Sequence, residues 1–181
     1  MPKEGTKEIA RTAILLALTA AIQITGRYFT TFLGPMNMFI VGTLVNACLL
    51  ISVDYAGIRG ASVIAFISPF TAVLTGAPVP IPFIPFIGIG NFLLVLTFYL
   101  LRRTILGIVI GAIVKFFFLF ASVTFFLKLS DLPSKLVSVL YFSFSWPQIV
   151  TALLGGIVYL TAKRILRGKL STDESPPNSK R

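Results

Sequence analysis

Six long apolar stretches constrain the fold of this 181-residue chain more than any other feature. A helix needs about 20 mostly apolar residues to cross the hydrocarbon core of a bilayer. The six stretches cover residues 9–28, 36–53, 56–75, 83–101, 104–127 and 137–163. The sequence therefore predicts an all-α membrane protein, with six transmembrane helices in one bundle.

Composition excludes the main classes of soluble protein. Charged residues make up 12% of the chain, about half of the roughly 25% found in an ordinary soluble domain. Histidine is absent, Cys48 is the single cysteine, and six residues are acidic. Metal sites built on His or paired Cys therefore lack their ligands, and Ser-His or Cys-His nucleophile systems lack their parts. We expect neither an enzyme nor a bound cofactor or metal; a membrane enzyme would need Lys115 or a serine as its nucleophile.

Basic residues gather at one end of the predicted bundle. Six helices place both termini on one side, and twelve of the sixteen Lys and Arg residues fall on that side: Lys3, Lys7, Arg11, Arg59, Arg102, Arg103, Lys163, Arg164, Arg167, Lys169, Lys180 and Arg181. Three fall on the other side: Arg27, Lys128 and Lys135. The positive-inside rule then predicts a multi-pass protein of the cell membrane with both termini in the cytoplasm. This distribution accounts for most of the net charge of +10 without nucleic acid.

The chain divides into one membrane domain and two short tails. Residues 1–8 are expected to form a cytoplasmic N-terminal tail, and residues 9–167 the six-helix domain. Residues 168–181 end in a polar, proline-containing segment. We predict that this last part is a disordered cytoplasmic tail.

Five polar or amphipathic side chains lie at similar depths in the outer half of the predicted bundle. At about 1.5 Å per residue, Asn91 is about 12 Å from the outer end of its stretch and Lys115 about 18 Å. Asn46, Trp146 and Gln148 lie about 14–17 Å deep. These five residues are the predicted substrate-binding set, although depth alone does not show that they face one cavity.

Lys115 is the most informative of the five. A lysine near mid-membrane costs roughly 2.5–3.5 kcal/mol on insertion scales. No acidic residue lies inside any of the six stretches to pair with it. Its ammonium must therefore reach outward or bond to backbone carbonyls, or else face a water cavity or an anionic ligand.

The other four residues each have a binding role and a structural alternative. Pro147 removes a backbone hydrogen bond and is expected to break the last helix. Trp146 beside it offers a face for stacking, and Gln148 offers a donor and an acceptor. The alternatives are a core tryptophan at an ordinary proline kink and, for Asn46 and Asn91, hydrogen bonds between helices.

Two further patterns concern the surface of the bundle. Ala13, Ala17 and Ala21 are spaced by four, so they share one helix face that another helix can approach closely. That helix belongs either to this bundle or to a partner. Residues 76–85 contain four prolines and are predicted to be an extended, non-helical outer segment. This segment is either a plain connector or the rim of a binding pocket.

Several segments carry a family resemblance: ARTAILLALTAA at 10–21, LVNA at 44–47, ISPF at 67–70, PFIGIGN at 85–91 and VKF at 114–116. They resemble the substrate-binding S components of energy-coupling factor (ECF) transporters, and the resemblance covers about residues 7–167. It implies a subunit that binds a vitamin or similar micronutrient from outside with high affinity. Such a subunit docks on a membrane T component carrying two ABC-type ATPases, topples in the membrane and releases its substrate inside.

The resemblance also assigns roles to residues. Ala13, Ala17 and Ala21 would be the docking face, and residues 29–35 a lid. Asn91, Lys115, Trp146 and Gln148 would lie in a pocket formed by the fourth to sixth helices.

The source of transport energy favours the same interpretation. The six stretches contain no Asp, Glu or His, the residues on which proton-driven carriers usually depend. The chain also lacks a G-x-x-x-x-G-K-[ST] nucleotide-binding motif. Uphill transport would therefore take its energy from another protein. The alternative function is a stand-alone small carrier or channel that works as an oligomer.

Overall fold

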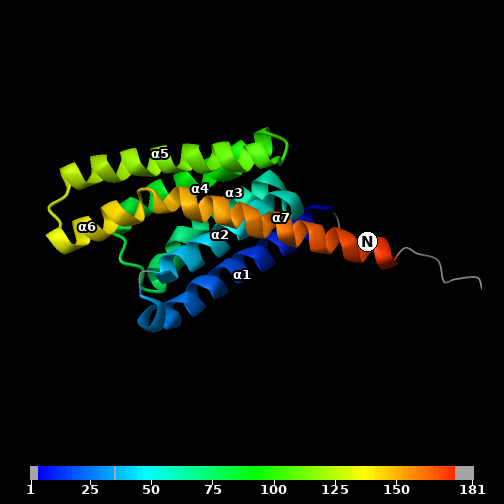
Figure 1. Ribbon diagram of the computed structural model, residues 1–181, viewed down its shortest axis with the longest axis horizontal. Coiled ribbons are helices and arrows are strands. Elements are labelled where there is room, and N and C mark those ends of the chain that lie inside the picture. The colour runs from blue at the N-terminus through cyan, green and yellow to red at the C-terminus, as the bar shows by residue number, and fades with distance from the viewer. Residues whose placement is uncertain (1–3, 35, 174–181) are drawn as a thin grey trace, which may run out of the picture.

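The computed structural model describes residues 4–34 and 36–173, which are helical throughout apart from short connections. The elements are α1 (Glu4–Leu33), α2 (Met36–Tyr55), α3 (Gly57–Leu74), the 3-10 turn η1 (Ile81–Phe83), α4 (Ile84–Leu100), α5 (Ile105–Leu129), α6 (Ser134–Ser143) and α7 (Pro147–Asp173) (Figure 1). Six segments are long and apolar enough to cross a membrane, the last comprising α6 and most of α7. The predicted all-α bundle of six spanning helices is confirmed.

Helix α2 lies at the centre of the bundle, where it packs against α1, α3 and α7, while α4 packs between α3 and α5. Small residues allow the closest of these contacts. A Cβ added to Gly155 of α7 would lie 2.8 Å from the Thr43 carbonyl oxygen and 2.9 Å from the Ala47 backbone nitrogen, both in α2. Glycine at this position therefore sets how closely α7 approaches α2, and with it which side chains of the two helices meet.

The first helix is longer than its apolar stretch predicts. Its 30 residues make it about 45 Å long at 1.5 Å per residue. The expected lid at residues 29–35 is helical as far as Leu33, so only Gly34 and residue 35 connect α1 to α2. The expectation of a lid loop here is wrong: the helix continues past the apolar stretch because nothing before Gly34 stops it. Gly34 has φ +50°, a backbone conformation that ends a helix readily.

The proline-rich segment is non-helical over only half of its length. Residues 76–80 are irregular, but Ile81–Phe83 form the 3-10 turn and α4 begins at Ile84. The prediction of an extended segment to residue 85 is wrong in this second half. Pro85 lies in the first turn of α4, where a proline sacrifices no helical hydrogen bond.

The last stretch is broken where Pro147 predicts. Helix α6 ends at Ser143, and α7 begins at Pro147 itself. Helix α7 then continues through Asp173, so the first six residues of the predicted C-terminal tail are helical; residues 174–181 lie outside the described residues. At the other terminus α1 begins at Glu4, and residues 1–3 are likewise outside them.

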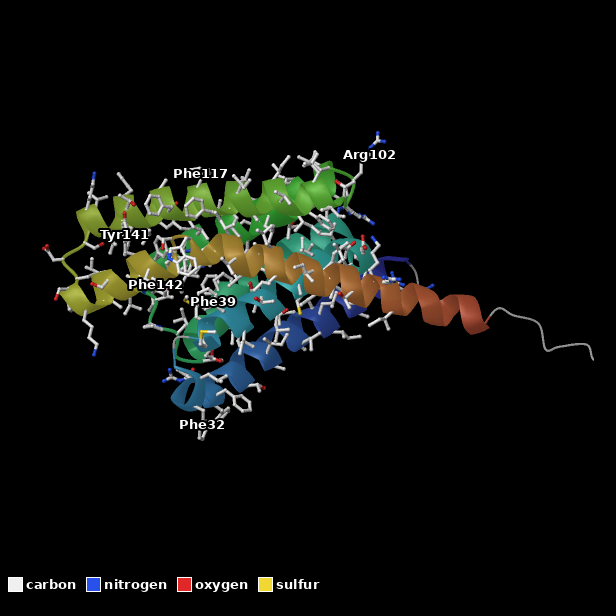
Figure 2. All side chains as sticks on the ribbon, viewed as in Figure 1. Phe32, Phe39, Arg102, Phe117, Tyr141 and Phe142 are labelled. Atoms are coloured by element: carbon white, nitrogen blue, oxygen red, sulfur yellow. The ribbon has the colours of Figure 1, made fainter. Side chains whose placement is uncertain are left out.

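We call the end of the bundle at which α1 begins and α7 ends the terminal end; it lies at the right of Figure 1. Asp54 anchors this end through ion pairs with Arg103 (3.2 Å) and Lys163 (2.8 Å). The turn between α4 and α5 contains Arg102 and Arg103 with φ of 53° and 59°, a left-handed conformation that costs about 1–2 kcal/mol for a residue with a Cβ. The pair with Asp54 stabilises this turn, while Arg102 points away from the bundle (Figure 2).

Candidate binding cavity

Lys115 is buried in the middle of α5, with 3% of its surface exposed. Its Nζ donates a hydrogen bond to Asn46 Oδ1 in α2 at 2.7 Å. Asn46 Nδ2 in turn donates to Thr151 Oγ1 in α7 at 3.3 Å. The Thr151 hydroxyl donates to the Gln148 carbonyl at 3.3 Å. A polar chain therefore crosses from α5 through α2 to α7 inside an otherwise apolar bundle.

The row of hydrogen bonds from α5 to α7 uses only part of the donor capacity of Lys115. An ammonium carries three N–H donors, and Asn46 Oδ1 is the one acceptor found for it among the described residues. The ion pairs in the described part of the chain all involve Asp54, at the terminal end. Among the described residues Lys115 thus has an amide partner and no carboxylate, which favours an anionic ligand or water beside its amine.

A second polar group forms around Pro69 in α3. Proline has no N–H, so the carbonyl of Ala65 four residues earlier loses its helical donor. Asn91 Nδ2 of α4 lies 3.5 Å from this oxygen and 3.4 Å from Ser68 Oγ. Gln23 of α1 donates from Nε2 to the Ser68 carbonyl at 3.0 Å. The carbonyl that the proline frees is thus approached by Asn91 of α4, and Gln23 of α1 bonds to the Ser68 carbonyl beside the proline.

Both polar groups border one cavity of about 170 Å³. Its polar lining consists of Gln23, Asn46, Ser68, Asn91, Lys115, Gln148 and Thr151. Met38, Val45, Val79, Ile87 and Phe144 are among its apolar lining residues. A single cation among amides, hydroxyls and apolar walls is an arrangement that binds small polar ligands by orientation and charge rather than by covalent chemistry.

Four of the five predicted substrate-binding residues meet at this cavity. Asn46, Asn91, Lys115 and Gln148 line it, and they come from four different helices. These four residues therefore lie at similar depths and also face the same space inside the bundle. Substrate binding by these residues stays a prediction.

Trp146 does not join them, and its assignment to the pocket is wrong. Its side chain is 52% exposed, and it packs against the rings of Phe39 (5.7 Å between centroids) and Phe142 (5.8 Å). Figure 2 shows both rings beside the break between α6 and α7. The depth estimate assumed one continuous helix, whereas the break before Pro147 turns Trp146 outward.

Three polar lining residues escaped the sequence analysis: Gln23, Ser68 and Thr151. Gln23 had a detectable signal, because Thr19 and Gln23 are polar residues spaced by four inside an apolar stretch. Ser68 had one too, since it directly precedes a proline inside an apolar stretch. Thr151 had no such signal in the sequence, because threonine is common in membrane helices and its hydroxyl is usually hydrogen-bonded there.

Ala13, Ala17 and Ala21 lie on the face of α1 opposite Thr19 and Gln23, and all three are exposed. The alternative that these alanines pack inside this bundle is therefore wrong. They form part of an outer surface together with exposed apolar neighbours such as Ile14 and Leu18.

The proline-rich segment contributes directly to the cavity wall. Val79 lines the cavity, and Arg27 of α1 holds the start of the segment by donating from a guanidinium nitrogen to the Gly76 carbonyl at 3.1 Å. Gly76 has φ +90°, which a residue with a side chain rarely adopts. Of the two roles considered, the geometry favours the pocket rim over the plain connector.

Comparison of the chain with known family models, with curated proteins and with solved structures finds no match in any of the three.

Proposed function

We propose that this protein is the substrate-binding S component of an ECF-type transporter, importing a vitamin or similar micronutrient. One observation carries the proposal: the side chain of Lys115, buried and with no carboxylate partner in the described part of the chain, borders a cavity that also exposes amide groups from four helices. An ionisable side chain at this depth is costly to insert and generally marks a functional site in a membrane protein. The family resemblance of the surrounding segments supports the same conclusion.

The cavity favours a particular class of substrate. With Trp146 outside, its chemistry is one cation, several amide donors and acceptors, and apolar walls. These groups suit a small molecule with an anionic carboxylate or phosphate group. A cavity of about 170 Å³ is smaller than the roughly 300–1,000 Å³ of typical ligand pockets. A vitamin-sized ligand therefore requires the rim around Val79 to move outward.

The remaining surfaces fit a subunit that depends on partners. The exposed alanine face of α1 allows close approach of another helix, and we propose it as the docking surface for a T component carrying two ABC-type ATPases. The basic terminal end would lie in the cytoplasm and the cavity rim would face outside, by the positive-inside rule. ATP hydrolysis by the partners would supply the energy.

The first experiment is purification of the tagged protein from its native membranes in mild detergent, with mass spectrometry of the proteins that accompany it. Recovery of a T component and two ATPases is the expected result. Partner-free protein that also moves solute in liposomes would overturn the proposal in favour of a stand-alone carrier or channel.

Substrate binding is tested at Lys115. Once a ligand is found by thermal-shift screening, Lys115→Ala is expected to weaken its binding at least tenfold, because the ligand loses its ionic partner. Lys128→Ala is the matched control, since Lys128 belongs to the same helix but is exposed near its end. Equal affinities of wild type and Lys115→Ala in a titration would exclude Lys115 from the site.

A further inference from the structure

A second and larger cavity, of about 580 Å³, lies at the terminal end of the bundle. It is bordered by the first turns of α1, by the turn between α2 and α3, and by the turn between α4 and α5. The charged side chains that line it are Lys7, Glu8, Arg11, Asp54, Arg59 and Arg103. It shares no lining residue with the cavity at Lys115.

The charges of this cavity are unbalanced in favour of the cations. Asp54 is already engaged by Arg103 and by Lys163. Lys7, Arg11 and Arg59 form no ion pair among the described residues, and Glu8 is the one lining carboxylate left against them. Three cations therefore surround a hollow with one acid, an arrangement that attracts an anion.

The fold brings these cations to one place and fixes Arg11 there. Lys7 and Arg11 are spaced by four and share one face of α1. A guanidinium nitrogen of Arg11 donates to the Tyr55 carbonyl at 3.2 Å, which joins α1 to the turn between α2 and α3. Helix α3 begins at this turn with Gly57, and no side chain caps it. The basic side chains attract an anion, and the first N–H groups of α3 and the positive end of its dipole add to this attraction.

Membrane-facing side chains beside the cavity indicate where the anion comes from. Tyr55 and Tyr99 line it and are each 41% exposed, as is typical of aromatic residues at a bilayer interface. Leu100 ends α4 and Ile105 begins α5 on either side of the adjacent turn; each is 65% exposed, and they offer apolar surface for acyl chains. A charged headgroup site next to an apolar outer surface matches a phospholipid better than a fully soluble ion.

We propose that this cavity binds a phosphate group, supplied by the headgroup of an anionic phospholipid. The phosphate lies among Lys7, Arg11 and Arg59, and the acyl chains follow the apolar surface beside Leu100. This inference goes beyond the transport proposal and does not depend on it.

The test compares phosphatidylglycerol with phosphatidylcholine on the purified, detergent-solubilised protein, by native mass spectrometry of bound lipid. The double variant Lys7→Gln/Arg59→Gln removes two of the three cations, both exposed, so folding is expected to be retained. The matched control Lys128→Gln/Lys135→Gln makes the same change in charge at exposed positions of the opposite end. Wild type and control should prefer phosphatidylglycerol, and the first double variant should lose about thirtyfold in its binding, given the attraction of each of the two basic side chains to anionic headgroups.

A competition arm with inorganic phosphate separates the two sources of the anion. Displacement of lipid only at high phosphate concentration supports the lipid headgroup as the natural occupant. Displacement at low concentration, with no preference between the two lipids, would overturn the lipid source and identify a free anion. Equal loss of phosphatidylglycerol from both double variants, or no loss from either, would overturn the site itself.

Discussion

Two lysines of this protein differ in the partners that surround their amino groups. Lys163, at the terminal end, lies 2.8 Å from Asp54 and donates to the Tyr159 hydroxyl at 2.6 Å. Lys115, deep inside, contacts one neutral amide. The first charge is neutralised where it lies, and its contacts join α2 to α7. Lys115 has no counter-charge among the residues that the structure describes, and it borders a cavity.

The difference separates a structural cation from a candidate functional one. Ion pairs that are complete within the fold hold helix ends together. A buried charge that is satisfied only in part is typical of binding sites, where stability is given up for function. Two predictions test this distinction, beginning with the larger effect, and a third tests where the binding cavity ends.

Removal of the carboxylate at the terminal end should have the largest effect on stability. Asp54→Asn leaves Arg103, Lys163 and Tyr159 without their shared carboxylate: the charge is lost, and one of its two oxygens becomes an NH2 donor. Because the pair is partly exposed, we expect a loss of about 2 kcal/mol, below the 3–5 kcal/mol of a fully buried pair. Thermal unfolding in detergent measures it, with Asp131→Asn as the control because Asp131 is exposed and lies beyond the end of α5. Equal midpoints for the two variants would show that the Asp54 cluster has no structural role.

Removal of the buried ammonium should have the opposite sign. Lys115→Met keeps the length of the side chain but removes the charge, and it leaves Asn46 Oδ1 without a donor. We expect a net gain in stability of about 1 kcal/mol, the desolvation cost of the charge minus the lost hydrogen bond. The same thermal assay measures it, with Lys128→Met as the control. A clear fall in the midpoint would mean that Lys115 is a structural residue like Lys163.

Replacement of Trp146 should have the smallest effect on binding. Trp146→Ala removes ring contacts with Phe39 and Phe142 outside the cavity. The affinity for a ligand found by screening should stay within about twofold of wild type, a difference of about 0.4 kcal/mol. Phe142→Ala is the control for a general loosening of this surface. A tenfold loss specific to Trp146→Ala would return this residue to the binding site and require the break between α6 and α7 to close over the ligand.

The positions of the spanning helices along the chain follow from the sequence. Hydropathy and the prolines are local properties, so the existence and order of the six spans and the break at Pro147 are predictable from short windows of sequence. The depths of Asn46, Asn91 and Lys115 follow as well, because the helical rise is constant. The distribution of charged residues predicts which helix ends lie at the same end of the bundle, as the cluster around Asp54 illustrates.

The direction in which each side chain points is decided only by the tertiary structure. The contact between Lys115 and Asn46 joins residues 69 positions apart, and it depends on how far α2 and α5 rotate about their axes. Packing sets that rotation, through contacts such as Gly155 against α2, and no local pattern encodes it. The same reason explains why Trp146 lies outside the cavity while Gln148, two residues later, lines it. In a chain this apolar, hydropathy places the helices in the membrane, but close packing between them decides which polar groups meet.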